Sequence, residues 1–293
     1  MLGLFLLLFI VIILPTTITT FESDDECLDF KKSPLNNILL IGMINKEQLL
    51  LITTNSKVYR ITYNDDPKSG DVTIDMTANP TTTLNDYYPV LINDARFKRS
   101  MSQNLIRHSF IFLWRTRLRM IFIADETIEY YPDWLEVQNN RFRLPSIETI
   151  PLSIYDPNGK ILFMLDIKSN EVKIQSIFLD AFPCDIFDME NIISNQQYRH
   201  ICYVSGKNSI YIETSIERRC LTPVKLLVRI GFISNVNVYL ITEKNVYFFS
   251  RQALTNTGKN YHFYKISTTT FFQCKEKGTL GIDDFRKFYH LQI

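Results

Sequence analysis

The stretch ILFMLDIKSNEVKI, residues Ile161–Ile174, carries the pattern that decides the predicted fold class. An apolar run is followed by a short polar turn and then by a second run in which apolar and polar residues alternate. Two such runs, separated by a few turn-forming residues, are typical of antiparallel strands joined by a hairpin. The sequence therefore predicts a β-hairpin over this stretch.

The same pattern occurs at five places in the chain. The four other hairpins are expected at Leu49–Ile61, Met120–Tyr131, Ile201–Ile212 and Val238–Phe249. Successive hairpins are 70, 44, 38 and 36 residues apart, measured between the first residues of their second strands, which are Val58, Ile128, Val172, Ile210 and Val246. The last three intervals resemble a single repeat length of roughly 40 residues, which is typical of the blades of a β-propeller.

A single blade leaves its faces uncovered, so blades stack around an axis and bury each other. Residues 35–275 are therefore predicted to form an all-β domain, a β-propeller of about five blades. The strand pairs resemble those of extracellular β-propellers of the YWTD family, most closely at Leu162–Asp166, where Asp166 matches the family tetrapeptide. The resemblance implies architecture only. A β-sandwich is the alternative, because it uses strands of similar length and spacing.

The N-terminus predicts export. Residues Leu2–Leu14 form an unbroken apolar run that ends at Pro15 and precedes a threonine-rich segment. A membrane-spanning helix needs about 17 to 25 apolar residues, so this run is short for an anchor and typical of a secretory signal. We expect a signal peptide over residues 1–20, an N-terminal segment over 21–34, and an extracellular product. The alternative is a retained signal-anchor in the secretory pathway.

The charge balance narrows the choice of partners. The chain has 32 Lys and Arg against 31 Asp and Glu, a net charge of +1. This argues against a nucleic-acid partner, which proteins bind through an excess of positive charge. After residue 20 no apolar run is long enough for a membrane span. We expect no membrane span once the signal has been cleaved.

The sequence has five cysteines, which can form disulfides if the protein is exported. In an oxidising compartment they allow up to two disulfides with one thiol left over. A bond between the first and the last would tie the two ends of a closed ring together, but the spacing leaves every pairing open, and buried free cysteines are the alternative. The residues are Cys27, Cys184, Cys202, Cys220 and Cys274.

The first interval between hairpins exceeds one repeat, and the excess falls in a polar, turn-rich insertion at residues 64–104. We expect this insertion to hold an extra outer strand at Val72–Met76 and a long loop. The tail, residues 276–293, fits no repeat.

The insertion contains a candidate processing site. Arg96, Lys98 and Arg99 precede Ser100 with the spacing Arg-x-Lys-Arg. Proprotein convertases of the furin type recognise this spacing, because their acidic subsites pair with arginines. The sequence therefore predicts cleavage after Arg99, with a solvated basic surface as the alternative.

Alternating arginines form a second basic motif. Arg115, Arg117 and Arg119 lie on one face if the segment is a strand. Guanidinium groups in a row fit an anionic glycan or a phosphate. A solvated hairpin tip is the alternative.

The sequence contains no nucleotide-binding or nucleophile motif, and its four histidines are too widely separated to predict a metal site. We expect no cofactor. The leading prediction is a secreted, non-enzymatic binding protein that presents loops of a β-propeller to an extracellular protein or glycan. One alternative is a secreted hydrolase with carboxylates at the propeller channel, for which the candidates are Asp125, Glu126, Asp166 and Asp185. The other is a fragment of a receptor ectodomain.

Overall fold

The secondary structure is mostly β-strand, with a few short helices, so the prediction of an all-β fold is confirmed. The computed structural model describes residues 33–65, 72–76, 82–114, 117–140, 148–154, 161–168, 171–178, 197–204, 206–213, 222, 224–256 and 258–273.

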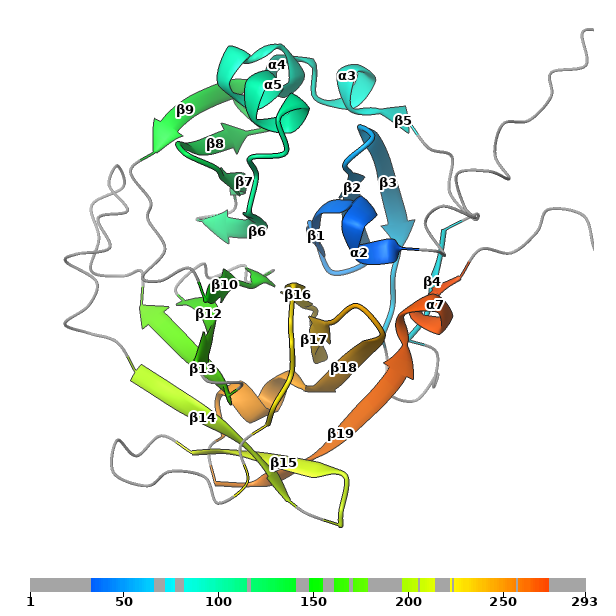
Figure 1. The fold of residues 1–293 in the computed structure, drawn as a ribbon, viewed down its shortest axis with the longest axis vertical. Coiled ribbons are helices and arrows are strands. Elements are labelled where there is room, and N and C mark those ends of the chain that lie inside the picture. The colour runs from blue at the N-terminus through cyan, green and yellow to red at the C-terminus, as the bar shows by residue number, and fades with distance from the viewer. Residues whose placement is uncertain are drawn as a thin grey trace, which may run out of the picture.

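The strands lie in four groups around a common centre (Figure 1). The first strand group follows helix α2 (Pro34–Asn37) and contains β1 (Ile38–Met43), β2 (Gln48–Thr53), β3 (Lys57–Thr62) and β5 (Thr82–Thr83). The second contains β6 (His108–Trp114), β7 (Arg117–Ile123), β8 (Thr127–Tyr131) and β9 (Glu136–Asn140).

The third strand group contains β10 (Thr149–Pro151), β12 (Ile161–Lys168), β13 (Glu171–Phe178), β14 (Gln197–Val204) and β15 (Ser209–Glu213). The fourth contains β16 (Ile230–Ile233), β17 (Asn237–Ile241), β18 (Asn245–Ser250) and β19 (Asn260–Ser267). The 3-10 helix η2 (Arg251–Leu254) lies between the last two strands. Strand β11 (Ser153–Ile154) pairs in parallel with both β6 and β16 and so joins the second group to the fourth. Strand β15 pairs antiparallel with β19 and joins the third group to the fourth, so one 14-stranded sheet runs through these three groups.

All five predicted hairpins are present as antiparallel pairs, namely β2 with β3, β7 with β8, β12 with β13, β14 with β15 and β17 with β18. They fall into four groups rather than about five. The reason is that β13 also pairs with β14, so the third and fourth hairpins form one continuous meander. A uniform interval between hairpins does not show where one meander ends and the next begins.

The innermost strands pack closely. Strand β1 contacts β6, β6 contacts β10 and β11, these contact β16, and β16 returns to β1. Two glycines permit this approach. A Cβ atom on Gly42 of β1 would lie 2.6 Å from the Cβ of Ser153, and one on Gly231 of β16 would lie 2.6 Å from Leu152 Cδ2. A side chain at Gly42 would therefore clash with Ser153, and one at Gly231 would clash with Leu152 and with the Tyr239 carbonyl oxygen.

The sheet of the first strand group is buried on both faces. Along β2, Leu49 and Leu51 pack with β16–β18, whereas the alternate residues Leu50 and Ile52 pack with β6–β8. Because successive side chains point to opposite faces of a strand, the two sets contact different neighbours. The whole of β1 is buried as well. The first strand group thus lies between the second and the fourth.

A polar network joins the first strand group to the fourth. The Asp65 side chain is buried and accepts hydrogen bonds from Ser234 Oγ, from Asn237 Nδ2 at 3.2 Å and from Tyr239 Oη at 3.0 Å. Burial, with the Asp65 charge as the next cause, raises the pKa of Tyr239 well above its usual range. The phenol therefore stays protonated and donates to Asp65. We call Asp65, Ser234, Asn237 and Tyr239 the Asp65 network.

Two segments that are far apart in the sequence meet beside this network, where Phe271 contacts Tyr239. Strand β4 (Ile74–Asp75) pairs in parallel with β20 (Phe272–Gln273), which follows helix α7 (Thr268–Phe271). The Met76 amide then donates to the Gln273 carbonyl oxygen at 2.8 Å. A strand therefore forms within the expected stretch Val72–Met76 but covers only Ile74–Asp75, and it connects the early and late parts of the chain.

The expectation of a long loop in the 64–104 insertion is wrong for its second half, which forms α3 (Leu84–Tyr87), α4 (Pro89–Asn93) and α5 (Ala95–Ser102). Local signals begin these helices. The Thr83 side chain accepts from the Asp86 amide, Pro89 occupies the first turn of α4, and the Asp94 carboxylate accepts from the amides of Arg96 and Phe97. The helices bury Leu84, Tyr88, Leu91 and Phe97 against the first two strand groups.

Several predictions fall outside the described residues. They include the signal peptide, the tail, and four of the five cysteines, Cys202 being the one that is described. The signal and disulfide predictions therefore stay predictions. Within the described ranges, no helix combines the length and the apolar character that a membrane crossing requires.

Candidate functional site

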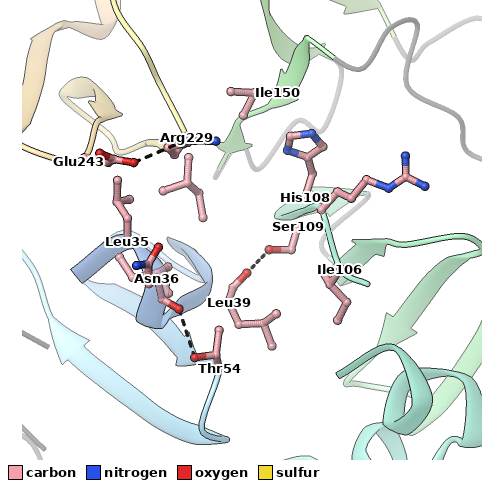
Figure 2. Close-up of a pocket in the computed structure, with 13 residues that line it drawn as sticks. Leu35, Asn36, Leu39, Thr54, Ile106, His108, Ser109, Ile150, Arg229 and Glu243 are labelled. Carbon is pink, nitrogen blue, oxygen red and sulfur yellow. Dashed lines mark hydrogen bonds and ion pairs between the residues drawn. The ribbon is translucent and has the colours of Figure 1, made fainter. Parts of the chain in front are cut away.

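A pocket with a volume of about 340 Å³ opens where the inner strands begin (Figure 2). Its lining comes from the start of β1 and the helix before it, from the start of β6, from β10, and from the start of β16. The lining residues are Leu35, Asn36, Ile38, Leu39, Thr54, Ile106, Arg107, His108, Ser109, Ile150, Arg229, Ile230 and Glu243. A volume of this size lies at the lower end of the usual range for small-molecule sites.

Hydrogen bonds within and between strand groups fix the pocket wall. Ser109 Oγ on β6 donates to the Leu39 carbonyl oxygen on β1, and Thr54 Oγ1 donates to the Asn36 carbonyl oxygen at 3.3 Å (Figure 2). The first contact joins two strand groups, and the second lies within the first group, between residues 18 positions apart. The wall is therefore held by the packing of the groups and needs no ligand to form.

The charged groups at the rim are solvated and only loosely paired. Arg229 lies 3.6 Å from Glu243, with side-chain exposures of 58% and 63%. Arg107 lies 3.4 Å from Asp125, with exposures of 54% and 64%. Exposed ion pairs of this kind contribute about 0 to 1 kcal/mol. These four side chains can therefore change partners at little cost.

The carboxylates that the hydrolase alternative needs do not gather in the pocket. Glu243 is the one acidic residue in its described lining. Asp125 and Glu126 are exposed in the turn between β7 and β8, Asp166 lies within β12, and Asp185 is outside the described residues. Glycoside hydrolysis requires two carboxyl groups about 5 to 9 Å apart across the bond that is cleaved. The described lining offers a single such group.

The predicted arginine face is divided between the interior and the surface. Arg119 of β7 is buried and lies 3.0 Å from Glu129 of β8, with side-chain exposures of 7% and 2%. Its guanidinium also lies 4.8 Å from the centre of the Tyr131 ring. Burial, and then the nearby Glu129 charge, raises the pKa of Tyr131 above its usual range. The charge of Arg119 is therefore balanced inside the protein.

Arg117 lies on the same side of β7 and is exposed. Its guanidinium sits 4.1 Å from the centre of the Trp134 ring, and Trp134 stacks on Tyr131 at 5.1 Å. Trp134 is 46% exposed and Leu135, which follows it with a φ of 53°, is 61% exposed. Arg115 lies outside the described residues. The anion-contact prediction stays open for Arg117.

The candidate convertase site lies in α5, not in a loop. Arg96 pairs with Asp94 at 2.9 Å, and Ser100 is buried, whereas Lys98 and Arg99 are exposed. Proteases cleave extended backbone, so cutting after Arg99 requires α5 to unfold locally first. Cleavage stays a prediction.

Comparison with the models of known protein families finds no matching family, and comparison with curated protein sequences finds no match. Within the described residues, no three His, Cys, Asp or Glu side chains lie close enough to hold a metal ion. Function must therefore be argued from the pocket. Arg229 and Glu243 belong to no motif in the sequence, because each lies next to a strand among ordinary turn and strand residues.

Proposed function

We propose that the chain is a non-enzymatic binding protein built on a propeller-like scaffold of four strand groups. Support for the scaffold comes from the first strand group, whose two faces pack against different neighbours. A sheet in a two-layer sandwich buries one face and exposes the other. The inner strands of the groups contact one another in a cycle, which also favours the propeller-like scaffold.

The observation that carries the binding function is the composition of the pocket. It is preformed at the centre of the molecule, it is half apolar in lining, and it holds one carboxylate, which is paired with an arginine. Pockets with an apolar body and a few converging polar groups are the usual form of ligand sites. A hydrolase would need a second carboxylate there.

Exposed apolar residues support a protein as an additional ligand. Trp134 and Leu135 project from the turn between β8 and β9, and Arg117 covers one face of the indole. Trp and Arg are the residue types that most often anchor protein interfaces. An extracellular protein that contacts this turn fits the proposed export of the chain.

The pocket is tested by ligand-observed NMR with a panel of small fragments. We expect a subset to give saturation-transfer signals with the wild-type protein and to lose them with Thr54→Trp, which fills the rim. Arg99→Gln, on the exposed face of α5, is the control. If no fragment depends on Thr54, the pocket is not the binding site.

The enzymatic alternative is tested with chromogenic glycosides and esters. The binding proposal expects no turnover above buffer. Turnover that disappears in Glu243→Gln would establish the hydrolase instead. The intact mass of the protein from culture medium, with and without reduction, tests export, cleavage after Arg99 and the number of disulfides.

A further inference from the structure

The base of the pocket is apolar. Ile38, Leu39, Ile150 and Ile230 line it and are each less than 10% exposed, and Leu35 and Ile106 extend the apolar surface toward the rim. These side chains are already largely out of water, so the apolar surface that becomes buried on binding is chiefly that of the ligand. Burial of apolar area contributes about 25 cal/mol per Å², so the base favours a hydrocarbon group.

The rim carries an excess of positive charge. Arg107 comes from the second strand group and Arg229 from the fourth, and Glu243 is the one carboxylate in the described lining. Figure 2 shows Arg229 and Glu243 on one wall of the pocket and His108 on another. Guanidinium groups bind carboxylates through paired N–H donors. An anionic head group at the rim can accept from Arg229, while Arg107 adds positive charge to the part of the rim that comes from the second strand group.

The present ion-pair partners of Arg107 and Arg229 do not prevent these arginines from binding an anionic head group. Their ion pairs have N–O distances of 3.4 and 3.6 Å and side chains that are more than half exposed. A ligand carboxylate at 2.7 to 2.9 Å forms a stronger charge-assisted hydrogen bond than these separations allow. Glu243 competes with the ligand for Arg229, whereas Asp125 holds Arg107 from outside the lining.

We propose that the pocket binds a small amphipathic anion, a carboxylate attached to a short hydrocarbon chain, with Arg229 and Arg107 at the head group and the isoleucines around the chain. This inference rests on the proposed function, because it names the ligand class of the same pocket. It also predicts opposite effects for the two members of the Arg229–Glu243 pair. Neutralising Arg229 removes a donor, whereas neutralising Glu243 releases that donor to the ligand.

Isothermal titration with octanoate, its neutral isostere octanamide, and octylammonium tests the proposal. We expect octanoate to bind at least about tenfold more tightly than octanamide, as charge-assisted hydrogen bonds imply, and octylammonium not to bind. Arg229→Gln should weaken octanoate binding about tenfold and leave octanamide within about twofold. Glu243→Gln should strengthen octanoate binding. Arg99→Gln, an exposed arginine outside the pocket, should change neither affinity.

The possible outcomes distinguish a wrong ligand class from a wrong binding site. Equal affinities for octanoate and octanamide, both abolished by Thr54→Trp, would overturn the anion proposal and leave the pocket as the binding site. Octanoate binding that is insensitive to Thr54→Trp would place the ligand elsewhere and count against both proposals. No octanoate binding at millimolar concentration also overturns the anion proposal. Circular dichroism of each variant confirms that an altered affinity does not reflect unfolding.

Discussion

Each of the two ends of the inner strands β1 and β16 carries a carboxylate, but the two carboxylates have opposite surroundings. Where β16 ends, the Asp65 network is buried and its carboxylate accepts three hydrogen bonds. Where the same strands begin, Arg229 and Glu243 face solvent across a longer gap. The first end closes the contact between the first and fourth strand groups, and the second end leaves charged groups free to exchange partners.

The two carboxylates differ because Asp65 is desolvated and Glu243 is not. A buried carboxylate has lost its water, so each hydrogen bond that it accepts is needed to offset that loss. An exposed carboxylate keeps its water and gains little from a neighbouring arginine. The Asp65 network therefore stabilises the fold, whereas the charged groups at the pocket rim are able to bind a ligand.

The largest expected effect comes from Asp65→Ala. The change leaves the buried donors of Ser234, Asn237 and Tyr239 without their shared acceptor. Each buried donor left unsatisfied costs about 1 to 3 kcal/mol, so we expect a loss of about 3 kcal/mol or more in the free energy of unfolding. Urea denaturation followed by circular dichroism measures it. Asp125→Ala, which removes an exposed carboxylate, should cost less than about 1 kcal/mol. Similar losses for the two variants would remove the distinction between the two ends.

Gly42→Ala tests the close packing of the inner strands between these ends. The added Cβ would lie 2.6 Å from the Cβ of Ser153, and overpacking of this kind costs about 1 to 3 kcal/mol. Thermal and urea unfolding report the loss. Ser153→Gly removes the clashing atoms, so the double variant should be more stable than the sum of the two single changes predicts. Strict additivity would show that the two backbones do not approach each other here.

Asp94→Ala tests a carboxylate whose exposure lies between that of Asp65 and that of Glu243. Burial opposes ionisation of Asp94, but hydrogen bonds from the Arg96 side chain and from the Phe97 and Arg96 amides outweigh it and hold the pKa below its usual value. We expect a loss of about 1 kcal/mol near neutral pH, as for other helix caps.

The pH dependence of this loss has a defined sign. Because the folded pKa is lowered, the contribution of Asp94 is complete above the unfolded pKa of about 3.9 and disappears as the pH falls through the folded value. The difference between wild type and Asp94→Ala should therefore shrink in acid. Asp94→Asn keeps an acceptor for the cap without the charge, and its stability relative to Asp94→Ala should not follow this titration. A difference that grows in acid would contradict the assignment.

Glu243→Gln should have the smallest effect on stability. The side chain is 63% exposed and its partner lies 3.6 Å away, so we expect a change in unfolding free energy below about 1 kcal/mol. Differential scanning fluorimetry is sufficient to measure it. A loss comparable to that of Asp65→Ala would mean that the rim is a structural element.

Local sequence pattern predicted the five hairpins, and all are present. It did not predict how they group, because the pairing of β13 with β14 joins two hairpins whose spacing resembles that of separate repeats. The helices α3–α5 were also missed, although Thr83 and Asp94 occupy N-cap positions that the sequence displays. The turn-forming residues of this segment are typical of a loop, whereas here they begin helices.

The sequence by itself determined the class of structure, because strand and hairpin formation depends on the alternation and turn chemistry of adjacent residues. Only the tertiary structure decided which polar residues are buried and which form a site. Asp65 meets Ser234 across 169 positions, and Leu39 meets Ser109 across 70. Contacts between residues so distant in the chain arise from the packing of strand groups, which leaves no local pattern in the sequence.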